Sequence, residues 1–269
     1  MDSRHSDSTR PWVLITGASS GIGESLAMEW AKRGTHALVL AARNTERLNR
    51  IAESCAAWTE ARVMPLDLGD PSSIDRFADG LAASGIRLSV VVHNAGISQR
   101  SRVLDTDLSV VRKIMEVNYF GTVQLTQRVL PSMIEMGKGE FIVITSLVGK
   151  FGTPLRSAYS ASKHALHGFF DSLRAELGSR GIRVMMVCPG FIRTEISINA
   201  LTGAGERQGS MDEAQARGMD PAVFARHLLS HRDAAREEVC IGGREVFGVL
   251  LKRWFPRVFS KIISRAKVT

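Results

Sequence analysis

The sequence predicts an α/β fold of the Rossmann type, in which a doubly wound parallel sheet of about seven strands forms a single domain. Short β-branched runs alternate with longer helix-like segments along the chain. Runs such as Val90–Val92 and Ile142–Ile144 are apolar on both faces, which is typical of parallel strands covered by helices on both sides. Repeated β-α-β units require right-handed crossovers and build a doubly wound sheet.

The same patterns place each element along the chain. We expect strands at Trp12–Thr16, Ala37–Ala41, Arg62–Leu66, Leu88–His93, Glu140–Ser146, Arg183–Cys188 and Val239–Ile241. We expect helices over residues 22–33, 44–58, 71–84, 107–136, 157–179 and 220–231. Residues 11–243 therefore form the predicted domain, after a disordered N-terminus at residues 1–10.

Two segments depart from this alternation. Residues 195–219 are rich in Gly, Ser, Ala and Gln, and an irregular stretch of that length is usually a lid over a site or a disordered loop. Residues 244–269 follow the last strand as a basic, amphipathic extension. No internal repeat or low-complexity linker divides the chain into two domains.

Composition narrows the functional classes. The 269 residues contain 44% hydrophobic residues, but no stretch approaches the roughly 20 apolar residues of a membrane-spanning helix. The N-terminus has no apolar run, so we expect no signal peptide. The three cysteines are widely separated and have neither disulfide-framework nor zinc spacing, so we expect a reducing, cytoplasmic compartment and no metal site.

The net charge of +8 is concentrated at the C-terminal end. Residues 252–269 contain six basic residues and no acid, which leaves +2 for the first 251 residues. No nucleic-acid-binding motif accompanies these charges, so we expect no nucleic-acid partner.

A glycine-rich turn joins the first strand to the first helix. It reads Thr16-Gly17-Ala18-Ser19-Ser20-Gly21-Ile22-Gly23. Glycines at such a turn let the backbone approach a pyrophosphate, whose charge then lies at the helix N-terminus. A tight strand-to-helix connection would need similar glycines, but the position after the first strand favours a nucleotide site.

The spacing Gly-x-x-x-Gly-x-Gly resembles the cofactor motif of the short-chain dehydrogenase/reductase family. The resemblance continues through Asp67-Leu68, Asn94-Ala95-Gly96, Asn118, Ser146, Tyr159-Ser160-Ala161-Ser162-Lys163 and Pro189-Gly190 with Thr194. It implies a catalytic set of Asn118, Ser146, Tyr159 and Lys163. It also implies a cofactor site formed by Gly17, Ser19, Ser20, Gly21, Ile22, Gly23, Arg43, Asp67, Leu68, Asn94, Ala95, Gly96, Tyr159, Lys163, Pro189, Gly190, Ile192 and Thr194.

The end of the second strand indicates which dinucleotide is bound. In dinucleotide-binding folds an acid at this place bonds the ribose 2′-hydroxyl, whereas an arginine accommodates a 2′-phosphate. Here Ala42 stands where NAD-using members of the family have Asp, and Arg43 follows. Arg43 could instead be a solvated helix-start residue, but a charge-assisted hydrogen bond to a phosphate favours NADP(H).

Tyr159 and Lys163 carry the predicted chemistry. They are four residues apart, so both side chains project from one helix face. A nearby ammonium favours the phenolate of a tyrosine whose free pKa is near 10, and Tyr159 could then exchange a proton with a carbonyl or an alcohol. The family resemblance implies that Lys163 also binds the nicotinamide ribose, that Ser146 bonds the reacting oxygen and that the Asn118 backbone helps hold a relay water.

The residues around Tyr159 are most similar to the hydroxysteroid-dehydrogenase-like branch that includes the dehydrogenase/reductase member 7 group. That resemblance implies a lipophilic carbonyl or alcohol, such as a steroid, a retinoid or a long-chain ketone, and a homodimer formed through the helices at 107–136 and 157–179. A 3-oxoacyl-thioester reductase and a non-catalytic, NADP(H)-sensing protein are the alternatives. A sensor would not need Ser146, Tyr159 and Lys163 together.

The C-terminal extension has an apolar stripe at helical spacing. Leu251, Trp254, Phe255, Val258, Phe259, Ile262 and Ile263 form it, with basic residues between them. Pro256 predicts a break with a fresh helix starting there. A basic helix with aromatic residues suits a membrane surface, so we expect peripheral membrane contact through residues 252–269. Alternatively, the stripe packs on the domain itself or on a partner subunit.

Overall fold

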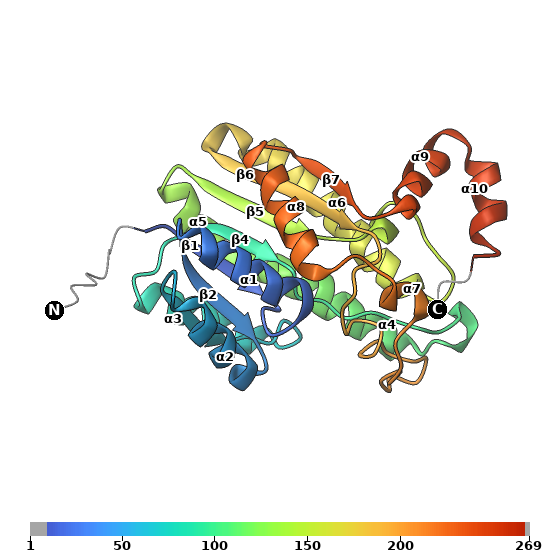
Figure 1. Ribbon diagram of the computed structural model, residues 1–269, viewed down its shortest axis with the longest axis horizontal. Coiled ribbons are helices and arrows are strands. Elements are labelled where there is room, and N and C mark those ends of the chain that lie inside the picture. The colour runs from blue at the N-terminus through green and yellow to red at the C-terminus, as the bar shows by residue number, and fades with distance from the viewer. Residues whose placement is uncertain (1–9, 267–269) are drawn as a thin grey trace.

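The computed structural model describes residues 10–266 as one doubly wound α/β domain (Figure 1). Its sheet has the order β3-β2-β1-β4-β5-β6-β7, and all neighbouring strands are parallel. The strands are β1 (Trp12–Thr16), β2 (Ala37–Ala42), β3 (Ala61–Pro65), β4 (Leu88–His93), β5 (Gly139–Ile144), β6 (Ile182–Pro189) and β7 (Glu238–Ile241). The predicted fold class and all seven predicted strands are confirmed, with ends that differ by at most two residues.

Helices cover both faces of the sheet. One face packs on α1 (Gly21–Arg33), α2 (Thr45–Cys55) and α8 (Pro221–Asp233). The other packs on α3 (Pro71–Ala83), α5 (Gly121–Glu135) and α6 (Ser157–Leu177). Both cores consist of apolar strand and helix side chains, because every central strand is buried on both faces. The strand order reverses between β1 and β4, where open α/β sheets leave a crevice for ligands.

The helix predicted over 107–136 is not continuous. It consists of α4 (Leu108–Met115), a π-helical turn (Glu116–Phe120) and α5. Such turns are frequent at functional sites, and this one contains Asn118. The helix predicted over 44–58 ends at Cys55, because the chain must turn back toward β3, where the hydroxyl of Thr59 donates to the carbonyl of His36 at 2.6 Å.

The segment 195–219 is ordered and lies against the body of the domain. It contains α7 (Glu213–Ala216), and the amide of Leu201 donates to the carbonyl of Ser98 at 2.9 Å. We call residues 195–219 the lid. The prediction of a disordered N-terminus falls on residues 1–9, which lie outside the described residues, and on Arg10, which is exposed.

The C-terminal extension forms two short helices that meet next to the break predicted at Pro256. They are α9 (Phe247–Trp254) and α10 (Pro256–Ile263), and α10 starts at the proline that predicted a fresh helix. Figure 1 shows the pair as a hairpin that projects from the β7 end of the domain. We call residues 247–263 the C-terminal hairpin. None of the helices among residues 10–266 is both long and apolar enough to cross a bilayer.

Candidate active site

The glycine-rich turn is shaped by close backbone contacts. Gly17 and Gly21 have φ angles of +64° and +59°, a region that favours glycine. A Cβ on Gly23 would lie 2.3 Å from the carbonyl oxygen of Gly17, so the first turn of α1 packs directly on the loop. This leaves the N-terminus of α1 open toward the crevice, as binding of a pyrophosphate requires.

Asn94 and Thr16 fasten this turn to the next strand of the sheet. The side-chain nitrogen Nδ2 of Asn94 donates to the backbone carbonyl oxygens of Thr16 at 3.0 Å and Gly17 at 3.2 Å. The hydroxyl of Thr16 donates to the carbonyl of Val92 at 3.2 Å and accepts from the amides of Asn94 and Ala95 at 3.0 and 3.1 Å. These bonds fix the cradle across the point where the strand order reverses.

A single cavity of about 1500 Å³ extends over the C-terminal edge of the sheet. Seventeen of the eighteen predicted cofactor residues line this cavity, because the sheet brings their loops together at its C-terminal edge. Those that line the cavity are Gly17, Ser19, Ser20, Gly21, Ile22, Arg43, Asp67, Leu68, Asn94, Ala95, Gly96, Tyr159, Lys163, Pro189, Gly190, Ile192 and Thr194. Gly23 supports the turn from behind. The arrangement fits a dinucleotide, because a backbone cradle and the predicted proton donor line the same cavity.

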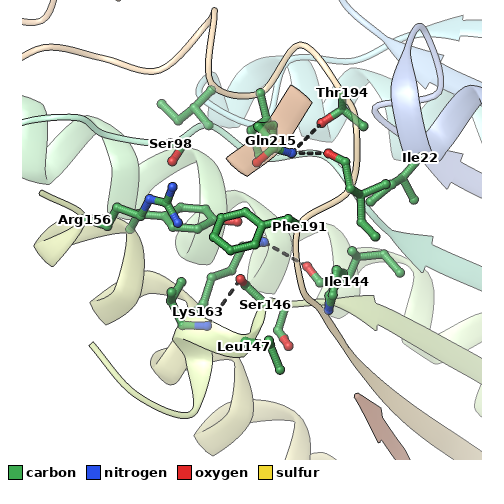
Figure 2. A pocket seen from close by; sticks show the side chains of 18 of the residues that line it. Ile22, Ser98, Ile144, Ser146, Leu147, Arg156, Lys163, Phe191, Thr194 and Gln215 are labelled. Atoms are coloured by element: carbon green, nitrogen blue, oxygen red, sulfur yellow. Dashed lines mark hydrogen bonds between the residues drawn. The ribbon is translucent and has the colours of Figure 1, made fainter. Parts of the chain in front are cut away.

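Ser146, Tyr159 and Lys163 meet at the floor of this cavity. Ser146 follows β5, and Tyr159 and Lys163 lie one turn apart on α6. The Ser146 hydroxyl is hydrogen-bonded to Tyr159. The Lys163 ammonium lies 5.7 Å from the centre of the Tyr159 ring and donates to the carbonyl of Ile144 at 2.8 Å (Figure 2).

Burial dominates the ionisation of both groups. It lowers the pKa of Lys163 to about 8. Burial also raises the pKa of Tyr159, while Arg156, Arg100 and the hydrogen bond from Ser146 lower it. The sequence assigned this tuning to Lys163 and to the positively charged oxidised nicotinamide, and the structure adds two arginines that the motif does not contain.

Asn118 supports the site without lining the cavity. Its side chain accepts from the amide of Ile97 at 2.8 Å and donates to the carbonyl of Ile97 at 2.9 Å and to the hydroxyl of Ser162 at 3.0 Å. Ser162 in turn donates to the carbonyl of Tyr159 at 2.8 Å. The side chain thus braces the turn of α6 that carries Tyr159, whereas the backbone carbonyl of Asn118 accepts from Thr122 at 3.0 Å.

Several cavity residues were not predicted. Arg100, Arg156, Phe191 and Gln215 line the same cavity as Tyr159, and Figure 2 shows Arg156, Phe191 and Gln215 there. Arg156 precedes Tyr159 by three residues, so the helical spacing could have indicated it. Gln215 of the lid donates to the carbonyl of Ile192 and approaches the hydroxyl of Thr194 at 3.4 Å, a contact with no signal in the sequence.

The comparisons with known proteins agree with this geometry. The family described as short chain dehydrogenase matches residues 11–204. The chain belongs to the short-chain dehydrogenase/reductase family. The dehydrogenase/reductase is 46% identical over 222 residues to a "Dehydrogenase/reductase SDR family protein 7-like" of Drosophila melanogaster, covering 81% of this chain and 68% of the relative. It is 38% identical over 264 residues to "Dehydrogenase/reductase SDR family member 7B" of Danio rerio, covering 95% and 85%.

Solved structures of this family superpose on the dehydrogenase/reductase. A short-chain dehydrogenase from Streptomyces avermitilis has a TM-score of 0.82 and 29% identity, covering 97% of this chain and all of the other. One from Sphingobium yanoikuyae in complex with NADPH has a TM-score of 0.76 and 26% identity, covering 96% and 97%. The protein is therefore an oxidoreductase of this family, and the predicted resemblance to the member 7 group is confirmed.

Proposed function

We propose that the protein is an NADP(H)-dependent oxidoreductase that interconverts a carbonyl and a secondary alcohol on a lipophilic substrate. The observation that carries the proposal is the shared cavity, which is lined by Ser146, Tyr159 and Lys163, by the glycine-rich cradle and by apolar side chains of the C-terminal hairpin. The bound cofactor supplies or accepts the hydride. Tyr159 donates a proton to the carbonyl oxygen in reduction and takes one from the alcohol in oxidation, and Ser146 orients that oxygen by hydrogen bonding.

The preference for NADP(H) rests on the end of β2. Ala42, Arg43 and Arg47 line the cavity there. No acid in this strand end repels a 2′-phosphate, and Arg43 offers it a charge-assisted hydrogen bond. The superposed Sphingobium enzyme holds NADPH, and a Burkholderia phymatum enzyme of 21% identity holds NAD, so the fold is compatible with either cofactor and the proposal rests on the residues at the end of β2.

The lipophilic substrate is inferred from the far wall of the cavity. Phe247, Leu250, Trp254, Phe255 and Ile262 of the hairpin line it. The volume of about 1500 Å³ exceeds the roughly 300–1,000 Å³ of ordinary ligand pockets, so a second molecule fits beside the dinucleotide. An apolar wall opposite a polar catalytic floor suits a substrate with a long apolar part and one reacting oxygen.

The decisive experiment follows NADPH oxidation with steroids, retinal, aliphatic ketones and acetoacetyl thioesters in wild type and in Tyr159→Phe. We expect a lipophilic ketone or aldehyde to be reduced, and activity to fall by at least roughly 10²–10⁴-fold in the variant while NADPH still binds. Near-normal turnover by Tyr159→Phe would exclude the assigned proton donor. Turnover confined to the thioesters would establish the 3-oxoacyl alternative, and NADPH binding without any turnover would establish the sensing one.

The cofactor preference has its own test. We expect kcat/KM with NADPH to exceed that with NADH in wild type, and the ratio to fall or reverse in Ala42→Asp/Arg43→Leu. Arg50→Gln, an exposed arginine on the same helix as Arg47, is the matched control. A wild type that favours NADH, or an unchanged ratio in the double variant, would contradict the assignment.

We also propose that the C-terminal hairpin contacts an anionic membrane surface, which would place a cytoplasmic protein at the bilayer periphery. Trp254 and Phe255 are 68% and 61% exposed. Among the described residues of the stripe only Phe259 is buried, and the centre of its ring lies 5.0 Å from the centre of the Phe151 ring. The exposed basic residues beside them are Lys252, Arg253, Arg257, Lys261 and Arg265. Each adds up to about 1 kcal/mol near an anionic leaflet.

Co-sedimentation with phosphatidylserine-containing vesicles tests this contact. We expect the intact protein to sediment, high salt to weaken the binding, and both deletion of residues 252–269 and Lys252→Gln/Arg253→Gln/Arg257→Gln to abolish it. Arg50→Gln serves as the control for loss of an exposed positive charge. Equal sedimentation of intact and truncated protein would refute the contact. Loss of the expected α5–α6 homodimer on truncation would show instead that the hairpin packs on a partner subunit.

A further inference from the structure

Three charged side chains form a buried cluster on the cavity wall beside Tyr159. The Nε and Nη2 atoms of Arg100 donate to one carboxylate oxygen of Asp212 at 2.8 and 2.6 Å. Arg156 donates to the same oxygen at 3.3 Å. The side chains of Arg100, Arg156 and Asp212 are 5%, 8% and 1% exposed. Two guanidinium groups therefore share one carboxylate, and the cluster carries one net positive charge that is largely buried.

The cluster joins three separate parts of the chain. Arg100 lies on the loop after β4, where its Nη1 also donates to the Ser98 hydroxyl at 2.8 Å. Arg156 immediately precedes α6. Asp212 belongs to the lid, where its other carboxylate oxygen accepts from Gln208 at 3.0 Å. Although burial disfavours a charged Asp212, these hydrogen bonds and the two arginines hold its pKa below the usual value, so it stays ionised.

Arg156 is the N-cap residue of α6, and Tyr159 lies three positions later in the first turn of that helix. The Arg156 guanidinium lies 5.7 Å from the centre of the Phe191 ring, which fixes it toward the cavity (Figure 2). The groups that face Tyr159 are Lys163 from its own helix, Arg156 from the N-cap of that helix, Ser146 from the end of β5 and Arg100 from the β4 loop.

The two arginines differ from Lys163 in how firmly they hold their charge. Burial lowers the pKa of Lys163 to about 8, so part of its ammonium is deprotonated slightly above neutral pH. Burial and the charge of Arg100 lower the pKa of Arg156 only to about 10, so its guanidinium remains charged over the working range. The arginines thus supply a constant positive charge close to a phenol that burial would otherwise keep protonated.

We propose that Arg100 and Arg156 are positioning residues for Tyr159. Asp212 holds these two arginines in place only while the lid lies against the body of the domain. The packed lid thereby keeps Tyr159 ready for proton transfer. The role rests on the proposed function of Tyr159 as acid and base. Neither arginine transfers the proton: each acts through the ionisation of Tyr159. Removing one of them leaves Asp212 paired with the other, so single-arginine variants keep a partner for the buried carboxylate.

The chain allows a direct test because it contains only two tyrosines. In a Tyr119→Phe background, Tyr159 is the sole tyrosine, and ¹³Cζ-tyrosine NMR follows its ionisation with and without NADP⁺. We expect Arg100→Gln, and independently Arg156→Gln, to move the titration to higher pH. Arg100→Lys should stay close to the parent because it keeps a cation. Arg102→Gln, an exposed arginine two residues away, is the control.

The pH profile of alcohol oxidation provides a second readout. We expect Arg100→Gln to displace the limb that depends on the Tyr159 phenolate to higher pH and to lower kcat at neutral pH roughly threefold to tenfold, with KM little changed. If the NMR titration shows no phenolate of Tyr159 below the pH at which the protein unfolds, the pH profile alone tests the proposal. Superimposable titrations or profiles of parent and Arg100→Gln would overturn the proposal, and so would an effect confined to KM, which would mark a substrate contact. Absence of turnover by every variant would count against the proposed function, and the NMR titration would still test the cluster.

Discussion

His93 should make the protein less stable in mild acid by an amount that the structure specifies. It ends β4, is 3% exposed and stacks on Phe141 with ring centres 5.8 Å apart. One ring nitrogen lies 2.9 Å from the hydroxyl of Thr126, and the other has no hydrogen-bond partner among the described residues. Burial, assisted by the positive charge of Lys163, lowers the pKa of His93 to about 3. Only one of the two ring nitrogens of this buried histidine is therefore hydrogen-bonded.

Whether acid raises or lowers the free energy of unfolding depends on which state, folded or unfolded, binds the proton. Between pH 6.5, the usual pKa of histidine, and the folded-state value of about 3, the unfolded chain binds a proton that the folded protein does not. The free energy of unfolding therefore falls as the pH falls through this range. With 1.36 kcal/mol for each pKa unit, lowering the pH from 7 to 5 removes about 2 kcal/mol through His93 alone.

Urea unfolding at pH 7 and pH 5 measures this loss. We expect the free energy of unfolding of wild type to fall by about 2 kcal/mol more than that of His93→Gln, which cannot gain a proton. His36 and His167, whose pKa values burial also lowers to about 4, are present in both proteins and cancel in the comparison. His227→Gln replaces an exposed histidine and should behave as wild type. Parallel losses in wild type and His93→Gln would refute the reasoning.

Two further predictions concern the cradle and the hairpin. Gly23→Ala places a Cβ 2.3 Å from the Gly17 carbonyl, so we expect at least tenfold weaker NADPH binding by fluorescence titration; Gly168→Ala, where a Cβ meets nothing within 4 Å, should bind normally. Phe259→Ala removes the buried anchor of the hairpin and should lower its local stability by about 3–5 kcal/mol, seen as faster hydrogen exchange confined to 247–263, whereas the exposed Val258→Ala should not. Normal binding by Gly23→Ala, or unchanged exchange in Phe259→Ala, would contradict these two readings.

The sequence was sufficient to predict the strands of the sheet and the part of the candidate site that consists of local motifs. Buried parallel strands are continuous apolar runs, so their ends could be placed within two residues, as at Trp12–Thr16. The cradle and the Tyr159–Lys163 pair were also predictable, because the spacing of residues within one turn fixes which of them meet. The family resemblance supplied the remaining partners from other loops.

Contacts between distant segments could not be predicted in this way. Arg100 and Asp212 are 112 positions apart, and nothing in either segment indicates the other. The side chain of Asn118 could equally have faced the cavity, but the π-helical turn directs it to Ile97 and Ser162. The ordering of the lid depends on such pairings, since its own glycine-rich composition favours a loop without fixed structure.

The site is divided between the sheet and two segments near the C-terminus, the lid and the C-terminal hairpin. This division explains how the chain can combine the chemistry of its family with a substrate of its own. The cradle, Ser146, Tyr159 and Lys163 are fixed by strands whose register is set by two apolar cores, so their positions tolerate little change. The lid and the C-terminal hairpin contact the same cavity but lie outside the sheet, and they attach to the surrounding loops through backbone hydrogen bonds such as Leu201 to Ser98 and through side chains such as Asp212 and Phe259. Substitutions there can reshape the substrate wall without disturbing proton transfer, except at Asp212, where the wall and the acid–base group are joined through two arginines. The lid is therefore the place where a change in substrate specificity should also change the pH dependence of the reaction.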